Sequence, residues 1–139
     1  MTNPETGDAL NDRDHENLER RWIDRKLAEI ARLRRVDCDT GRLLMGRRDH
    51  ASYEGIVIPY ILPGESRVRE WRLRRDHPDI EYKDGKPKER RKYLSPPGRR
   101  NMIYFVPGVS QELLKAVATP IIITEGEFKT LALWRLANQ

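Results

Sequence analysis

Residues 55–75, GIVIPYILPGESRVREWRLRR, decide which fold class this sequence fits. The opening run is rich in β-branched residues and predicts a strand, in which Pro59 indicates either a sheet edge or a strand end. A turn is expected at Gly64. The stretch therefore predicts a hairpin that pairs residues 56–62 with residues 68–74.

The second half of this hairpin alternates between two faces. Side chains along a strand point to opposite sides in turn, so Trp71 and Leu73 share one face, and Arg72 and Arg74 share the other. Two guanidinium groups placed in this way suit phosphate oxygens. The alternative is that both are ordinary solvent-facing residues paired with carboxylates.

Helices are predicted on both sides of the hairpin. Apolar residues recur at helical spacing between residues 12 and 34, and Asp24 could cap a second helix, so two helices with a break and one continuous helix both fit. Ser110 is expected to cap a short helix, and residues 128–136 have the pattern of an amphipathic helix.

Two more apolar runs predict strands. Residues 102–106 are typical of a strand, and the three isoleucines at residues 121–123 form a run of the kind that parallel sheets bury on both faces. Turns are expected at residues 39–41 and 83–86. The sequence thus predicts an α+β fold with N-terminal helices, antiparallel β hairpins and a C-terminal strand–helix unit.

Composition limits the domain organisation. Of 139 residues, 37% are hydrophobic and 35% are charged, which predicts one small core. We expect a flexible tail at residues 1–10, a helical segment at residues 11–35, a β-rich domain at residues 36–118 and the strand–helix unit at residues 119–139.

Charge and cysteine content narrow the function. The chain has 27 Lys and Arg against 22 Asp and Glu, a net charge of +5 that suits a polyanionic partner. The single Cys38 permits no internal disulfide and favours a reducing cytosol. The N-terminus lacks a signal-peptide pattern and no apolar run is long enough to span a bilayer, so we expect a cytoplasmic protein without a membrane role.

A Glu-Gly-Glu turn follows the three isoleucines. Glu125 and Glu127 would lie at the carboxyl end of a strand, where open α/β sheets commonly bind ligands, and Gly126 allows a ligand to approach closely. The two carboxylates could bind a divalent cation or act as an acid or base. Alternatively, a Glu near a helix N-terminus is favourable for the helix dipole without any chemistry.

A basic stretch runs from residue 69 to residue 100. Its Lys and Arg residues are interleaved with aromatic ones, a mixture that fits single-stranded nucleic acid, because cations release counterions from phosphates and exposed rings stack on bases. The strongest candidates for such contacts are Arg72, Arg74, Arg75, Lys92 and Tyr93. The alternative is a solvated loop neutralised by neighbouring carboxylates, with the aromatic residues in the core.

Four sequence blocks carry a resemblance to a known family. They are GIVIPY at residues 55–60, WRLRRDHP at residues 71–78, KYLSPPG at residues 92–98 and EGEFK at residues 125–129. Together they resemble a domain at the N-terminal end of primase-like and helicase-like replication proteins of phages, plasmids and integrated elements. The last block and the isoleucines before it are similar to the first motif of the Toprim domain, which primases, topoisomerases and related nucleases share.

The resemblance implies an incomplete Toprim-like α/β unit. In it, Glu125 would be the catalytic or Mg²⁺-side carboxylate, with Glu127 as a second acidic group and Lys129 as a phosphate contact. The family also carries a later Asp-x-Asp, but no Asp follows Glu125 here. Because a Mg²⁺ site needs several oxygen ligands, these residues are too few. Either the chain is the N-terminal piece of a longer or disrupted reading frame with a C-terminal Toprim/helicase portion, or a separate chain supplies the missing half.

The sequence therefore predicts the N-terminal part of a Toprim-bearing, primase-like replication protein of a mobile element that contacts single-stranded DNA or RNA. Nucleotidyl or phosphodiester transfer is expected only if the missing half and Mg²⁺ complete the site. The first alternative is a non-enzymatic nucleic-acid-binding or adaptor module in which the Glu-Gly-Glu turn is structural, and the second is a vestigial fragment that folds poorly.

Overall fold

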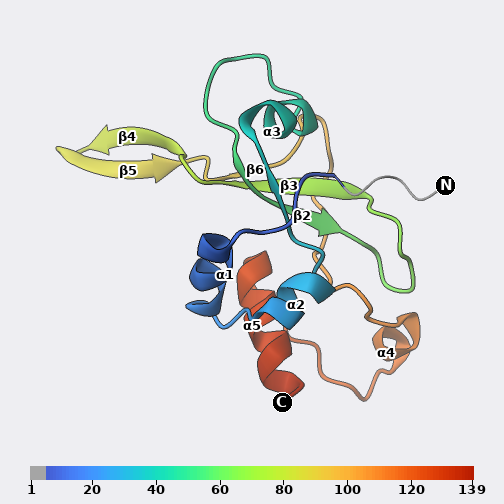
Figure 1. The fold of residues 1–139 in the computed structure, drawn as a ribbon. Helices are drawn as coiled ribbons and strands as arrows, with labels where there is room; N and C mark the ends of the chain where they lie inside the picture. The colour runs from blue at the N-terminus through green and yellow to red at the C-terminus, as the bar shows by residue number, and fades with distance from the viewer. Residues whose placement is uncertain (1–5) are drawn as a thin grey trace. The chain divides into compact units, whose positions relative to one another are not determined.

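A four-stranded sheet and a separate two-stranded ribbon hold the β-structure of the chain (Figure 1). The computed structural model describes residues 6–139. The sheet has the order β1 (Arg34–Val36), β2 (Gly55–Tyr60), β3 (Glu70–Arg75), β6 (Tyr93–Leu94), and the ribbon pairs β4 (Asp79–Lys83) with β5 (Lys86–Arg90). The helices are α1 (Asp12–Glu19), α2 (Arg25–Ile30), α3 (Cys38–Leu44), α4 (Gln111–Lys115) and α5 (Glu127–Ala137). The predicted α+β class, with helices near the N-terminus and antiparallel strand pairs, is confirmed.

The chain forms two compact units. Unit 1 contains residues 6–10, Leu33–Ile58 and Trp71–Arg100, and unit 2 contains Asn11–Arg32, Pro59–Glu70 and Asn101–Gln139. Each unit thus collects segments from distant parts of the sequence, whereas consecutive blocks were expected. Of the predicted tail, residues 1–5 lie outside the described residues, and Asp8 forms an antiparallel bridge with Arg35.

The hairpin predicted from residues 55–75 is present, since β2 and β3 are neighbours in the sheet. The pairing of β1 with β2 ends at Val57, so Pro59 lies beyond it, near the end of its strand. A proline at this place removes no hydrogen bond to β1. Pro59 therefore takes one of its two predicted positions, the strand end.

The core of unit 1 lies on this sheet. Val57 and Leu73, on the two central strands, are fully buried. They belong to one hydrophobic cluster with Val36, Met45, Tyr53 and Leu94. The strands approach closely at Gly55, where a Cβ atom would come within 2.0 Å of the Arg74 carbonyl oxygen. A larger residue at this position would push β3 away from β2.

Local capping residues shape the N-terminal helices. The Asn11 side chain accepts a hydrogen bond from the Asp14 backbone N–H at 2.8 Å and caps α1. Asp24 caps α2 in the same way, accepting from the Leu27 N–H at 2.8 Å. Trp22, between the helices, has a φ of 66°, which a continuous helix does not allow. The two-helix alternative is therefore correct.

The turn predicted at residues 39–41 is wrong, because these residues lie inside α3. The overlooked signal is Asp37, whose side chain accepts from the Thr40 N–H at 2.7 Å and caps the helix. Gly41 suggested a turn, but its role is packing: a Cβ atom there would meet the Tyr53 carbonyl oxygen at 2.0 Å.

The strands predicted at residues 102–106 and 121–123 are also wrong. Neither run belongs to a strand, and Ile121, Ile122 and Ile123 are 67%, 75% and 87% exposed. A strand needs a neighbour that supplies hydrogen bonds and side-chain cover. Within residues 6–139, neither run is paired with any strand, so the predicted C-terminal strand–helix unit is reduced to its helix, α5.

Contacts of α5 organise unit 2. The Arg135 guanidinium lies over the Trp22 ring, 5.1 Å from its centroid, and its Nη1 and Nε atoms are 3.4 Å from Glu19 and 3.5 Å from Asp24. The helix predicted at residues 128–136 is therefore present and is tied to the α1–α2 segment. Among the helices of residues 6–139, none has both the length and the apolar character needed to cross a bilayer.

Candidate nucleic-acid interface

The ribbon β4–β5 is a regular antiparallel hairpin in unit 1 (Figure 1). Lys83 pairs with Lys86, which leaves Asp84 and Gly85 as a two-residue turn. The φ angles of these two turn residues are 54° and 74°, and Asp-Gly is a preferred pair for such a turn. The position of the turn then fixes which residues oppose one another along the ribbon.

This register gives the ribbon two different faces, because directly opposed residues lie on the same side. One face carries charged residues alone: Asp79 opposite Arg90, Glu81 opposite Lys88, and Lys83 opposite Lys86. The other face carries Ile80 opposite Glu89 and Tyr82 opposite Pro87. Every residue of both strands is exposed, so no described part of the chain covers either face.

Pro87 fits the ribbon because of its place in the hydrogen-bonding pattern. Opposed pairs in an antiparallel hairpin alternate between hydrogen-bonded and non-hydrogen-bonded, beginning with the bonded pair that flanks a two-residue turn. Tyr82 and Pro87 are the second pair, so the proline nitrogen faces away from β4. No hydrogen bond of the ribbon is lost, and a further strand is hindered from pairing along β5.

A buried arginine anchors the base of the ribbon. Arg75 is 2% exposed, and its Nε donates to the Ser52 carbonyl at 2.8 Å. Its Nη2 donates to Asp79 Oδ1 at 3.1 Å and its Nη1 to the Arg91 carbonyl at 3.4 Å, so the guanidinium joins the two ends of the ribbon. It also lies 5.1 Å from the centroid of the Tyr53 ring. Arg75 was predicted to contact nucleic acid, and the structure instead encloses its side chain among these acceptors. Its observed contacts are structural, and its contact with nucleic acid stays a prediction.

A second ion pair fixes the bend between β3 and β4. Arg35 donates from Nη1 to Asp76 Oδ2 at 2.7 Å and from Nη2 to Asp76 Oδ1 at 3.1 Å. The Asp76 backbone N–H donates to the Glu54 carbonyl at 2.9 Å. A bidentate pair that is partly shielded from solvent is stronger than an ordinary surface pair. The ribbon therefore leaves the sheet at a fixed point.

The structure brings together the other cationic and aromatic residues predicted in unit 1. The Arg72 guanidinium lies over the Tyr93 ring, 5.4 Å from its centroid. Arg74 is opposite Tyr93 in the β3–β6 pair, and Lys92 Nζ is 3.3 Å from Glu89 Oε2. Residues Arg72, Arg74, Lys92 and Tyr93 are all half-buried, and we call these four the base patch.

The ribbon lysines were not singled out from the sequence. Lys83, Lys86 and Lys88 fell within the basic stretch but were given no particular role. The Asp-Gly pair was the available signal, because a two-residue turn predicts both the hairpin and its register.

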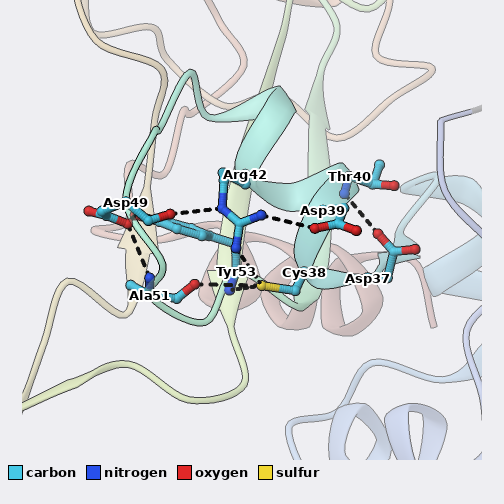
Figure 2. A network of polar contacts seen from close by, with 8 residues as sticks. All are labelled: Asp37, Cys38, Asp39, Thr40, Arg42, Asp49, Ala51 and Tyr53. Atoms are coloured by element: carbon cyan, nitrogen blue, oxygen red, sulfur yellow. Dashed lines mark hydrogen bonds and ion pairs between the residues drawn. The ribbon is translucent and has the colours of Figure 1, made fainter.

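A polar network centred on Arg42 holds α3 in place (Figure 2). Arg42 donates to the Asp49 carbonyl and to Asp39 Oδ1, both at 2.9 Å. The Tyr53 hydroxyl donates to Asp49 Oδ1 at 2.5 Å, and Cys38 Sγ accepts from the Tyr53 N–H at 3.4 Å. The bond from Tyr53 holds the pKa of the Asp49 carboxyl below its ordinary value, whereas burial raises the pKa of Tyr53. This network fixes the ring on which the anchoring arginine of the ribbon rests.

The Glu-Gly-Glu turn in unit 2 separates its two carboxylates. Glu125 is exposed and forms an ion pair with Lys129, one helical turn further on. Glu127 begins α5, is 5% exposed and accepts a hydrogen bond from the Tyr60 hydroxyl at 2.5 Å. One carboxylate faces solvent and the other is engaged inside the unit, so each has a partner of its own in this fold, and a shared Mg²⁺ site stays a prediction. Within residues 6–139, no group of three or more His, Cys, Asp or Glu side chains is arranged to hold a metal ion.

Tyr60 and Tyr104 lie beside each other near the buried Glu127 carboxylate. The rings of Tyr60 and Tyr104 are 5.2 Å apart, and the Tyr104 hydroxyl oxygen is buried without a hydrogen-bond partner among the described residues. Burial raises the pKa of Tyr104, and the charge of Glu127 raises it further. Tyr60 is 67 positions from Glu127 in the sequence, so no local pattern could have predicted this pairing.

No protein-family model, no curated protein and no solved structure matches this chain. The resemblance to Toprim-bearing replication proteins therefore rests on the four sequence blocks and stays a prediction.

Proposed function

We propose that unit 1 contacts single-stranded nucleic acid through its ribbon and base patch. The observation that carries this proposal is the exposure of three lysines, Lys83, Lys86 and Lys88, on an uncovered ribbon that also carries the acidic residues Asp79, Glu81, Asp84 and Glu89. All residues of β4 and β5 are exposed, and Lys83, Lys86 and Lys88 form no ion pair with another described residue. Exposed lysines on a narrow projection reach phosphates without displacing other parts of the chain.

The base patch supports the same activity. Its Arg72 guanidinium lies over the Tyr93 ring, and a planar guanidinium of this kind suits phosphate oxygens. Arg75 bonds to Asp79 and to the Arg91 carbonyl, and these residues follow and precede the segments that carry Arg74 and Lys92, so the ribbon base and the base patch are close in the fold. A ligand bound along the ribbon lysines therefore has further cationic residues, Arg72, Arg74 and Lys92, at the ribbon base.

In this proposal the chain is the N-terminal part of a Toprim-bearing, primase-like replication protein of a mobile element, acting in the cytoplasm. The four sequence blocks support that assignment. Nucleotidyl or phosphodiester transfer would require the missing half of the Toprim-like site, with Glu125 as its Mg²⁺-side carboxylate and Lys129 as a phosphate contact. The same blocks favour a C-terminal Toprim/helicase portion as partner.

A non-enzymatic nucleic-acid-binding or adaptor module is the second candidate. One observation favours it: Glu127 is buried and bonded to Tyr60, while Glu125 pairs with Lys129, so each carboxylate already has a structural partner. Both candidates share the nucleic-acid contact of unit 1 and differ in whether the turn takes part in chemistry.

Fluorescence anisotropy with a labelled oligo-dT tests the shared proposal. Affinity is expected to fall at least tenfold between about 50 and 200 mM salt, because phosphate contacts release counterions. The double variant Lys86→Ala/Lys88→Ala should weaken binding at low salt roughly fivefold or more. The matched control, Lys26→Ala/Lys115→Ala, removes two exposed lysines of unit 2 and should bind as the parent does. Absence of binding at low salt, or binding that salt does not weaken, would refute the proposal.

A further inference from the structure

The ribbon face that carries Ile80, Tyr82 and Pro87 is not covered by any described part of the chain. Ile80 and Tyr82 are 53% and 74% exposed, and Pro87 opposes Tyr82 across the ribbon. An isolated two-stranded hairpin is marginally stable in water, and an exposed apolar face adds to the cost. The fold nevertheless holds the ribbon in place through the Arg75 tie at its base.

The shape and chemistry of this face suit a nucleic-acid base. A tyrosine ring beside a rigid proline offers a flat apolar surface, and every base has a π-face that stacks on such a surface. Lys83 and Lys86 are the next opposed pair toward the turn, and their side chains start from the opposite face of the ribbon. Their long flexible stems reach round the narrow turn end, where they bring positive charge to the phosphates of a bound strand. The ribbon thus places an apolar surface for bases and positive charge for phosphates within one short hairpin.

We infer that the Ile80, Tyr82 and Pro87 face binds the bases of a single strand by stacking, with Tyr82 as the principal contact. This inference rests on the proposed nucleic-acid contact of unit 1 and specifies what the ribbon recognises. A duplex hides the faces of its bases and presents their edges, which are read by hydrogen-bonding side chains. The face carries an aromatic ring, an aliphatic side chain and a proline, together with Glu89, whose Oε2 atom is 3.3 Å from Lys92 Nζ at the ribbon base. Its apolar part favours unpaired bases.

An oligonucleotide without bases separates stacking from charge. Binding of the full chain would be measured by anisotropy to oligo-dT, to an abasic strand of the same length, and to a duplex of the same length. Tyr82→Ala is expected to weaken oligo-dT binding about tenfold, since one stacked base contributes roughly 1–3 kcal/mol. The same variant should bind the abasic strand as the parent does, and Tyr82→Phe should retain oligo-dT binding because it keeps the ring.

Trp22→Ala is the matched control, because it removes an exposed aromatic ring from unit 2. It should leave oligo-dT affinity unchanged, and circular dichroism should show that Tyr82→Ala keeps the parent melting temperature. Three outcomes would overturn the inference: equal affinity of Tyr82→Ala and the parent for oligo-dT, an equal loss on the abasic strand, or tighter binding of the duplex. If the parent binds oligo-dT in a salt-dependent way and Tyr82→Ala matches it, stacking fails while the nucleic-acid proposal stands. If the parent binds no oligonucleotide at low salt, both fail.

Discussion

Two runs of β-branched residues in this chain have nearly the same composition and opposite environments. Residues 56–58, Ile-Val-Ile, lie in β2, where all six residues are buried. Residues 121–123, three isoleucines, lie in no strand and are largely exposed. The difference is not propensity, since both runs favour extended backbone.

What separates the two runs is the presence of neighbours. In the sheet order, β2 lies between β1 and β3, so its backbone groups have partners on both sides. The isoleucine run has no hydrogen-bonded strand beside it within residues 6–139. An apolar segment therefore becomes a buried strand only when distant segments pair with it. Distant segments likewise decide whether a charged side chain is enclosed or left in solvent.

The sharpest test compares one substitution in the two runs. Ile58→Ala should lower the free energy of unfolding by about 3 kcal/mol, because it opens a cavity at a fully buried position. Ile122→Ala should change it by less than about 0.5 kcal/mol, because that side chain is mostly in water. Urea unfolding followed by circular dichroism measures both. Equal losses would mean that residues 121–123 belong to a core and would break the comparison.

Two arginines extend the comparison to charge. Arg75→Ala should cost about 2 kcal/mol, since it leaves the Ser52 and Arg91 carbonyls without their donor. It should also increase hydrogen exchange in β4 and β5, because the ribbon loses its tie. Arg90→Ala, which removes an exposed partner of Glu81, should cost less than about 1 kcal/mol. A ribbon whose exchange is unchanged in Arg75→Ala would contradict the anchoring role.

Two glutamates of one turn give a smaller effect. Glu127→Ala should lower the free energy of unfolding by about 1–2 kcal/mol, because the Tyr60 hydroxyl loses its acceptor in a buried place. Glu125→Ala removes an exposed carboxylate paired with Lys129 and should cost less than about 0.5 kcal/mol. Thermal melts of the two variants beside the parent provide the measurement. The reverse order would show that Glu125 is the structural residue of the turn.

The smallest expected effect is a pH dependence at the Arg42 network. Asp49 has a folded-state pKa below the ordinary value of 3.8, mainly because Tyr53 donates to it. The ionised Asp49 carboxylate therefore contributes its full stabilisation above the ordinary pKa of 3.8, and this stabilisation is lost as the pH falls through the lower folded-state pKa. Tyr53→Phe should reduce the stability lost between about pH 5 and pH 2.5, as measured by urea unfolding at each pH. If Tyr53→Phe loses as much stability as the parent over this pH range, the Tyr53–Asp49 hydrogen bond is not the cause of the pH dependence.

Local signals predicted the elements whose stabilising contacts are close in sequence. Asp24 and Ser110 cap α2 and α4 by accepting from N–H groups three residues ahead. The hairpin of β2 and β3 followed from one apolar run, one turn and one alternating run. Asp37 carried an equally local signal for α3, but the Thr-Gly pair after it suggested a turn instead.

The sequence showed which face of β3 each arginine takes, but not that Arg75 anchors the ribbon. Strand alternation places Arg75 on the same face as Leu73, which is buried, and Arg72 and Arg74 on the other. The alternation of side chains along β3 therefore already placed Arg75 on the buried face of the strand. Its structural partners could not be predicted, because Ser52 and Arg91 are 23 and 16 residues away in sequence.

The sequence by itself determined the helix caps, the Asp-Gly turn, the faces of the ribbon and the basic character of unit 1, because each depends on backbone geometry or composition within a few residues. The tertiary structure decided which isoleucine run is a strand, which arginine is buried and which glutamate is enclosed. Those outcomes depend on hydrogen-bond partners and solvent exclusion supplied by distant segments, and no local pattern encodes which segments will meet.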